Sequence, residues 1–266
     1  MTLVQAIVLG LAQGITEFLP ISSSGHLVML PRFFGWEDQG VVFDALLHGA
    51  TLIALLVVFW NDIVRIARGL LGRGDDEERR LGYWLILGSV PAFAVGFFLE
   101  PYVTALRDPR IVAASLVVWG IALWFADKQR SARGMKLKRA EKLRWHHALG
   151  IGVAQAVSLI PGTSRSGITI MASLMAGLDR SQAVRFSFLL GIPVFFGAFV
   201  FKGVEALQSG AGVESWWMLL AGALAACLSG IAAIKFLLRF VVAHHLTVFV
   251  WYRVVLGGVI LALFVL

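Results

Sequence analysis

The stretch of sequence that decides the fold is QGITEFLPISSSGH, which occupies residues 13–26 of an otherwise apolar N-terminal segment. Pro20 and the serines after it should break a helix after about 15 to 18 residues, which is too few to cross a membrane. A second stretch, PGTSRSGIT at residues 161–169, interrupts the chain in the same way. We therefore expect helical hairpins at about 1–35 and 147–178 that enter a membrane and turn back inside it, as re-entrant segments.

The two polar stretches belong to an internal repeat. Residues 10–59 match residues 152–201 at 13 positions when the two segments are aligned without gaps at an offset of 142. The GxAQ and SxSG patterns of both stretches share this one offset, so we infer a common origin for the two halves. The alignment places Ser23 opposite Arg165, which indicates that the copies have taken different roles.

The composition places the chain in a membrane. Hydrophobic residues make up 59% and charged residues 15% of its 266 residues, and the mean hydropathy is +0.83. Each half contains three apolar runs that can span a hydrocarbon core, which needs about 20 helical residues. These runs are residues 41–60, 82–100 and 111–127 in the first half and residues 183–204, 215–238 and 246–266 in the second. The alternative, in which the hairpin arms also cross fully, stays open.

Three crossings in one half would invert the next half relative to it. We therefore expect an all-α polytopic membrane protein with an inverted-topology repeat. Its parts are a first repeat at 1–127, a basic cytoplasmic linker at 128–146 and a second repeat at 147–266.

The positions of the basic residues predict the orientation. Five Lys/Arg at residues 61–80 and eight at 128–145 mark cytoplasmic loops by the positive-inside rule. The link at 36–39 has no Lys or Arg and should lie outside, whereas its counterpart at 179–182 contains Arg180 and should lie inside. The net charge of +7 thus reflects membrane orientation and contact with anionic lipid rather than nucleic-acid binding.

The first stretch carries an acid and an imidazole. Gln13 and Glu17 are four residues apart and face the same side of a helix. An ionised Glu at this depth is costly and usually functional, although it could also pair with a cation that holds the halves together. His26 is a candidate nucleophile or base, with a packed, hydrogen-bonded histidine as the alternative.

The second stretch carries the chemistry of anion binding. The planar guanidinium of Arg165 suits phosphate oxygens, and Gly162 and Gly167 let backbone N–H groups approach a ligand. A helix that restarts after the break also directs its first N–H groups inward. Asp44 and His48, four residues apart on the first long helix, either line the same cavity or form hydrogen bonds between helices.

On these residues the chain resembles the bacterial undecaprenyl-diphosphatase family, also called the bacitracin-resistance BacA/UppP family. The resemblance rests on the motifs at 13–26 and 161–167 and extends to the chain length and helix pattern. It implies an enzyme of the bacterial inner membrane that removes the terminal phosphate of undecaprenyl diphosphate. This reaction regenerates the carrier for peptidoglycan synthesis and confers bacitracin resistance. The resemblance also implies a divalent cation, Mg²⁺ or Ca²⁺.

The resemblance also assigns roles to individual residues, namely Glu17, Ser22, Ser23, His26, Ser164, Arg165 and Thr169. With the other motif positions, the expected phosphate-binding set is Ser22, Ser24, Gly25, Gly162, Ser164, Arg165, Ser166, Gly167 and Thr169. Many family members have Glu where this chain has Gln13, so Glu17 is the expected metal ligand and Gln13 an additional one. The attacking group is His26, Ser23 or a water activated by Glu17 or His26, and our interpretation favours His26.

The chief alternative is a transporter or flippase of a phosphorylated lipid carrier, since inverted repeats with broken helices are typical of transporters. In that case Glu17 would bind a proton or an ion, and Arg165 the phosphate. The expected partners are a polyprenyl diphosphate and membrane lipids, and the sequence leaves a homodimer open. The first hairpin's mouth should face outward, so we expect substrate to enter from the periplasmic or outer side.

Overall fold

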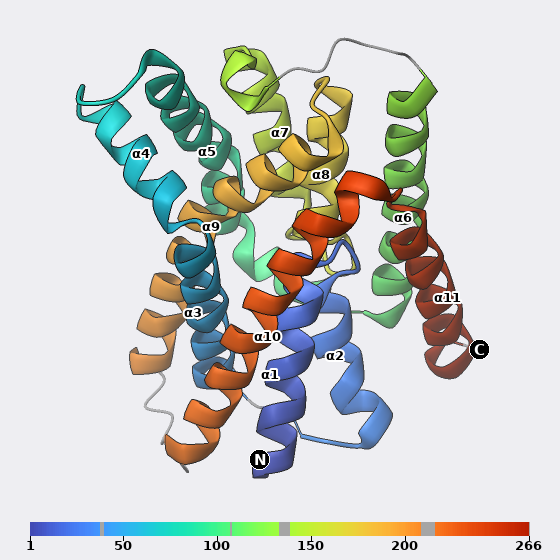
Figure 1. The fold of residues 1–266 in the computed structure, drawn as a ribbon. Coiled ribbons are helices and arrows are strands. Elements are labelled where there is room, and N and C mark those ends of the chain that lie inside the picture. The colour runs from blue at the N-terminus through green and yellow to red at the C-terminus, as the bar shows by residue number, and fades with distance from the viewer. Residues whose placement is uncertain (38–39, 107, 133–138, 209–215, 266) are drawn as a thin grey trace.

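The computed structural model describes residues 1–37, 40–106, 108–132, 139–208 and 216–265, and every regular element in these ranges is a helix (Figure 1). The helices are α1 (Leu3–Phe18), α2 (Ser23–Phe34), α3 (Gly40–Val58), α4 (Trp60–Leu70), α5 (Asp76–Ala105), α6 (Pro109–Ala132), η1 (Ala140–Lys142), α7 (Trp145–Val157), α8 (Arg165–Met175), α9 (Arg180–Gln208), α10 (Trp216–Ala243) and α11 (Thr247–Phe264). The prediction of an all-helical protein is confirmed.

Five of the described helices are long and apolar enough to cross a membrane, namely α5, α6, α9, α10 and α11. A sixth span is obtained when α3 and α4 are counted together, although the chain bends by 80° between them. The protein is therefore a multi-pass membrane protein, and the five or six candidate spans among its described residues coincide with the apolar runs that the sequence predicts.

One expected loop is wrong in part. Residues 61–80 were expected to form a basic loop, but residues 60–70 form α4. This helix is amphipathic and carries the ion pair of Arg65 with Asp62, one turn apart. A count of basic residues predicts on which side of the membrane a segment lies but takes no account of helical periodicity. The helix was therefore not predicted.

The basic linker is also shorter than expected. Helix α6 continues to Ala132, and α7 already begins at Trp145, with the short η1 between them. Residues 133–138 of the expected linker lie outside the described residues, as do residues 38–39 of the predicted outer link.

The hairpin helices are too short to cross. Helices α1, α2, α7 and α8 have 16, 12, 13 and 11 residues, and at 1.5 Å per residue even the longest spans about 24 Å of a core about 30 Å thick. Figure 1 shows the α1–α2 pair in the lower part of the molecule and the α7–α8 pair in the upper part, with their breaks close together in the middle. The break between α1 and α2 thus lies beside the break between α7 and α8.

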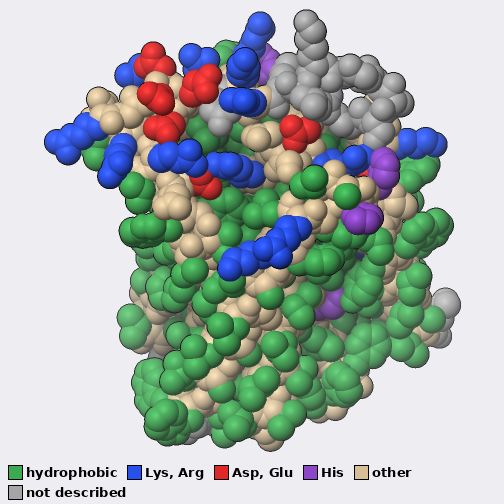
Figure 2. All heavy atoms as spheres, in the orientation of Figure 1, with side chains coloured by type: hydrophobic (Ala, Val, Ile, Leu, Met, Phe, Trp, Pro, Cys, Tyr) green, Lys and Arg blue, Asp and Glu red, His purple; other side chains and the backbone are tan. Residues whose placement is uncertain are grey.

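Helices at matching positions of the predicted repeat have matching packing partners. Helix α1 packs along α10, and its repeat counterpart α7 packs along α5, the counterpart of α10. Helices α3 and α9 correspond to each other and pack together, and so do α6 and α11. Charged side chains gather at one end of the molecule, around α4 and the start of α5, while the opposite half of the same face is largely apolar (Figure 2).

Candidate active site

The two breaks adopt the same backbone conformation. Ser22 has a φ of 75° and Ser164 a φ of 71°, and no other non-glycine residue in the described ranges has a positive φ. Each serine caps the following helix, since the Ser22 Oγ accepts from the Gly25 N–H and the Ser164 Oγ from the Gly167 N–H. A left-handed serine costs free energy, so its occurrence at both repeat positions indicates that the surrounding packing holds it there.

Hydrogen bonds join the two breaks directly. The Gly162 N–H donates to the Ser24 Oγ over 3.3 Å. The Ser166 Oγ donates to the Leu19 carbonyl oxygen over 3.1 Å. Gly162 has a φ of 88°, and an added Cβ would lie 2.4 Å from the Val112 carbonyl oxygen, so only glycine fits at this crossing. The structure thus brings together the two stretches that the sequence selects.

The carboxylate of Glu17 is the centre of the polar cluster. It is 7% exposed and accepts hydrogen bonds from three side chains. Gln13 donates through Nε2 over 3.2 Å, Ser23 donates through Oγ, and Arg165 donates through Nε over 3.5 Å. The first break therefore supplies an acid and a hydroxyl in direct contact, and the second supplies the cation beside them.

The guanidinium of Arg165 is held by apolar surfaces on α9. Its Cζ lies 3.9 Å from the centroid of the Phe195 ring, and an added Cβ on Gly191 would meet its Nη1 at 1.9 Å. The side chain is 9% exposed, and within the described residues neither Nη1 nor Nη2 has a hydrogen-bond partner. Buried guanidinium N–H groups are rarely left unsatisfied, so these two nitrogens are available to bind an acceptor.

Several of the predicted phosphate ligands have hydrogen-bond partners within the protein. The hydroxyls of Ser22 and Ser164 serve as helix caps, and Thr169 Oγ1 bonds Ser187 on α9 and the Arg165 carbonyl oxygen. Thr169 therefore ties α8 to α9. An added Cβ on Gly167 would lie 2.9 Å from Arg253 Nη1, so this glycine admits a neighbouring arginine.

His26 lies in the first break but is held away from Glu17. Its Nδ1 is 2.7 Å from the Ser22 carbonyl oxygen, and its Nε2 is 2.6 Å from the hydroxyl of Tyr252. A carbonyl only accepts, so Nδ1 carries the proton, and in the neutral ring Nε2 accepts from the tyrosine. The structure does not bring His26 into hydrogen-bond contact with Ser23 or Arg165.

Three further residues of this region were not selected from the sequence. Arg253 was overlooked although a cation within an apolar run is a recognised signal of function. Tyr252 and Phe195 carried no signal, because one aromatic residue among many on apolar helices is ordinary. His48, by contrast, was considered in the sequence analysis. Its ring lies 6.5 Å from that of Phe195, and its Nδ1 bonds the Asp44 carbonyl oxygen within α3.

The donor atoms suit a hard divalent cation only in part. Glu17, the unpartnered Gln13 Oε1 and the Ser23 hydroxyl are oxygen donors of the kind that Mg²⁺ and Ca²⁺ prefer. The described residues contain no group of three His, Cys, Asp or Glu side chains that could hold a metal alone. Such a site fits a metal that takes its remaining ligands from substrate phosphates, as Mg²⁺ commonly does.

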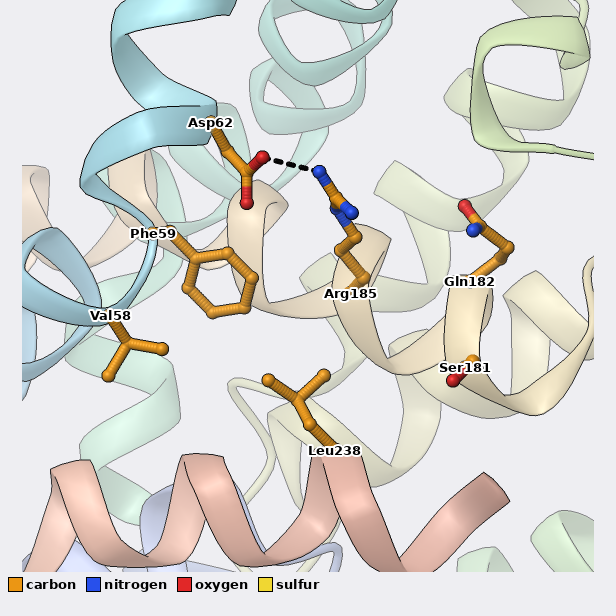
Figure 3. Close-up of a pocket in the computed structure, with 7 residues that line it drawn as sticks. All are labelled: Val58, Phe59, Asp62, Ser181, Gln182, Arg185 and Leu238. Carbon is orange, nitrogen blue, oxygen red and sulfur yellow. Dashed lines mark hydrogen bonds and ion pairs between the residues drawn. The ribbon is translucent and has the colours of Figure 1, made fainter.

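A cavity of about 280 Å³ lies elsewhere, at the bend between α3 and α4 (Figure 3). Its lining residues are Val58, Phe59, Asp62, Ser181, Gln182, Arg185 and Leu238. Arg185 points across it to an ion pair with Asp62, so its charge is already balanced. None of the residues predicted for the site lines this cavity, and we assign it no part in the chemistry.

Fold and site together define a class of protein, a helical membrane protein in which two interior breaks place an acid, a hydroxyl and a guanidinium with two free nitrogens side by side. The sequence model of the family described as bacitracin resistance protein BacA matches residues 6–259. The chain belongs to this family, as the motifs predicted.

Curated relatives cover almost the whole chain. A protein of Moorella thermoacetica named undecaprenyl-diphosphatase is 40% identical over 265 residues, which are 99% of this chain and 98% of the relative. Another of the same name from Teredinibacter turnerae is 43% identical over 262 residues, or 97% of each chain. Undecaprenyl-diphosphatase 1 of Pseudoalteromonas translucida is 40% identical over 262 residues, again 97% of each.

Proposed function

We propose that this chain is an undecaprenyl-diphosphate phosphatase that releases inorganic phosphate and regenerates undecaprenyl phosphate for peptidoglycan synthesis. The family, and relatives that carry this enzyme's name, support the assignment. The structural observation that carries it is the pair of buried, unpartnered nitrogens of Arg165 beside the hydrogen-bonded Glu17 and Ser23. This arrangement provides a cation for a phosphoryl group and an acid next to a hydroxyl, as phosphoryl transfer requires.

The phosphate contacts follow from the free donors. The Nη1 and Nη2 atoms of Arg165 offer a planar fork for two oxygens of the terminal phosphate. The first N–H groups of α2 and α8 add donors, since only those of Gly25 and Gly167 are taken by the serine caps. The remaining N–H groups of the two helix starts and the guanidinium of Arg165 would together hold the phosphoryl group between the two breaks.

The contact between Ser23 and Glu17 favours Ser23 as the attacking group. In this mechanism the Ser23 Oγ bonds to the terminal phosphorus, its proton passes to Glu17, and undecaprenyl phosphate leaves with the electrons of the broken P–O bond. Water then attacks the phosphorus of the phosphoserine and gives one proton to a phosphoryl oxygen. The proton held by Glu17 returns to the Ser23 Oγ as the bond between this oxygen and phosphorus breaks, which restores both residues and releases inorganic phosphate. Our earlier preference for His26 as the attacking group stays untested, but its hydrogen bonds to Ser22 and Tyr252 argue for a positioning role.

A divalent cation, Mg²⁺ or Ca²⁺, is part of this proposal. Glu17 and Gln13 Oε1 would hold it together with the diphosphate oxygens of the substrate, since the chain alone offers too few ligands. When bound, it would neutralise charge on the diphosphate and assist departure of the monophosphate.

We further propose an inverted repeat whose hairpins are re-entrant, with the first hairpin opening to the outer face of the bacterial inner membrane. The exchanged packing partners of α1 and α7, the matching serines and the short hairpin helices support this topology. The charged end around α4 would lie in the cytoplasm. Substrate would then reach Ser24 from outside, and labelling of Ser24→Cys by an impermeant reagent only from the cytoplasmic side would contradict this orientation.

Phosphate release from undecaprenyl diphosphate tests the function. Purified protein in detergent should release inorganic phosphate with Mg²⁺ or Ca²⁺ present and lose this activity in EDTA, with recovery when the metal is restored. A protein that releases no phosphate with metal present, but moves a labelled polyprenyl phosphate across liposome membranes, would be a transporter instead.

A further inference from the structure

Arg253, in the middle of α11, is buried completely and reaches the backbone of both breaks. Its Nη1 lies 3.4 Å from the Pro20 carbonyl oxygen in the first break. Its Nη2 lies 3.1 Å from that of Gly162 and 2.8 Å from that of Thr163 in the second. One side chain therefore contacts the two segments that carry the proposed chemistry.

The guanidinium is anchored from the other side by α6. Its Nε donates to the Leu116 carbonyl oxygen over 3.0 Å, and Nη2 lies 3.3 Å from that of Ser115. Gly120 on the same helix makes room for the side chain, since an added Cβ would contact it at 3.4 Å. The position of the guanidinium is thus determined by two spans rather than by the breaks alone.

These contacts provide hydrogen-bond donors to backbone carbonyl groups that a regular helix would otherwise satisfy. A carbonyl in a broken segment has no N–H donor one turn further on, and an unsatisfied carbonyl at membrane depth is costly. Arg253 supplies donors to Pro20, Gly162 and Thr163, which hold the breaks at a set separation together with the hydrogen bonds of Ser24 and Ser166.

The contacts also orient the backbone beside Arg165. In a trans peptide the N–H points opposite to the C=O. When Arg253 holds the Thr163 carbonyl, the N–H of Ser164 must point away from Arg253. Arg253 also adds positive charge beneath the first turn of α8, near Gly167. In the described part of the chain it forms no ion pair, so this charge is not neutralised by a carboxylate.

We infer that Arg253 is a positioning residue of the proposed phosphatase: it fixes the two breaks relative to each other and aims the donors of the second break, without binding substrate. The inference rests on the proposed function. Arg253 would act on the reaction indirectly, because the distance between Arg165 and Glu17 depends on how the two breaks are placed.

Kinetics of Arg253 variants test the inference. Arg253→Met should lower kcat by about 100-fold, the effect of a misplaced reacting group, with KM changed less than about 3-fold. Arg253→Lys keeps the charge but loses the planar fork, so kcat should lie about 10-fold below wild type. Arg180→Met is the matched control, because Arg180 joins α9 to Asp127 on α6 through a buried contact far along the helices from the breaks. It should keep the wild-type kcat per folded molecule.

Amide hydrogen exchange provides a readout that needs no activity. In Arg253→Met the peptides that cover residues 19–26 and 160–168 should exchange at least about 10-fold faster, because their carbonyl anchors are lost. Arg180→Met should leave both peptides as protected as in wild type. If wild-type protein released no phosphate, the proposed function would fail while this experiment still decided the role of Arg253.

Four results would overturn the inference. A raised KM with unchanged kcat in Arg253→Met would make Arg253 a substrate ligand. Full activity of Arg253→Lys would show that the charge at this position is enough for catalysis. A fall in kcat of Arg253→Met without faster exchange of the breaks would lead to the same conclusion. Unchanged kcat and exchange per folded molecule would reduce it to packing.

Discussion

The two breaks have the same backbone and different chemistry. Ser22 and Ser164 share a left-handed conformation and cap their helices through equivalent hydrogen bonds. At the next position, however, the first break has Ser23, which contacts Glu17, and the second has Arg165, which approaches the same carboxylate. The counterpart of Glu17 in the second half is Leu159.

The difference shows how two segments with the same backbone conformation can supply different chemical groups to one candidate site. The serines and glycines that shape the backbone are retained in both copies, because each break needs its cap and its turn. The positions that face the partner break have diverged, so that one copy supplies an acid and a hydroxyl and the other a cation. Predictions that break this division of roles are therefore more informative than those that remove either break.

The largest effect is expected from the acid and the cation. Glu17→Gln and Arg165→Ala should each lower phosphate release by about 1,000-fold or more, since each removes a charge that acts on the phosphoryl group. Leu159→Met, at the repeat position of Glu17, is the control and should stay near wild type. Phosphate assays on protein that elutes normally in size-exclusion chromatography provide the measurement, and near-normal release by either site variant would disprove the site.

The hydroxyl of the first break comes next. Ser23→Ala should lower kcat by about 100-fold or more and abolish covalent labelling from substrate with a radioactive terminal phosphate. Ser24→Ala, which loses the hydrogen bonds with the Gly162 N–H and the Ser22 hydroxyl but no contact with Glu17, should lower kcat by about 10-fold or less. If Ser23→Ala retained activity within about 3-fold of wild type, direct attack by water or by His26 would replace our mechanism.

The position of the Arg165 guanidinium can be tested without replacing a polar residue. Gly191→Ala places a Cβ against Arg165 Nη1 and should displace the guanidinium, which lowers kcat by roughly 30-fold while the fold is retained. Gly203→Ala on the same helix meets no neighbour and serves as the control. Equal activity of the two variants would show that the contact with Gly191 does not hold Arg165.

A smaller effect is expected at His26. His26→Gln keeps hydrogen-bonding capacity beside Ser22 and Tyr252, and it should lower kcat by about 10-fold or less because we assign the imidazole a positioning role. Tyr252→Phe should behave similarly or more mildly. Loss of activity as complete as in Glu17→Gln, with a labelled phosphohistidine in wild type, would return the attack to His26.

The smallest change in rate is expected at Gln13. Gln13→Glu adds a carboxylate beside Glu17, so the cation concentration that gives half-maximal activity should fall, while the rate at saturating metal stays within about 3-fold of wild type. Gln155→Glu is the repeat-matched control and should not alter the metal dependence. A metal titration that is identical for wild type and Gln13→Glu would argue against a cation at this position.

Much of the fold could be predicted from the sequence because membrane helices obey length and composition. The long apolar runs, the breaks around residues 20–25 and 161–167, and the shared offset of the halves are local signals. Helix α4 was not predicted because only the charges of this segment were considered. Its apolar face is evident only when the residues are placed on a helix. The contacts of Glu17 with Arg165 and of His26 with Tyr252 could not be predicted for a different reason, since they join residues more than a hundred positions apart.

The sequence by itself determined that this chain is a helical membrane protein with two polar breaks, and that Glu17 and Arg165 are the residues to examine. The tertiary structure alone decided which side chains meet. Glu17 accepts hydrogen bonds from Ser23 and Arg165, and His26 forms a hydrogen bond with Tyr252. Arg253 on α11 contacts the backbone of both breaks. The physical reason is that periodicity and hydrophobicity are properties of a segment, whereas the satisfaction of buried polar groups depends on which segments meet.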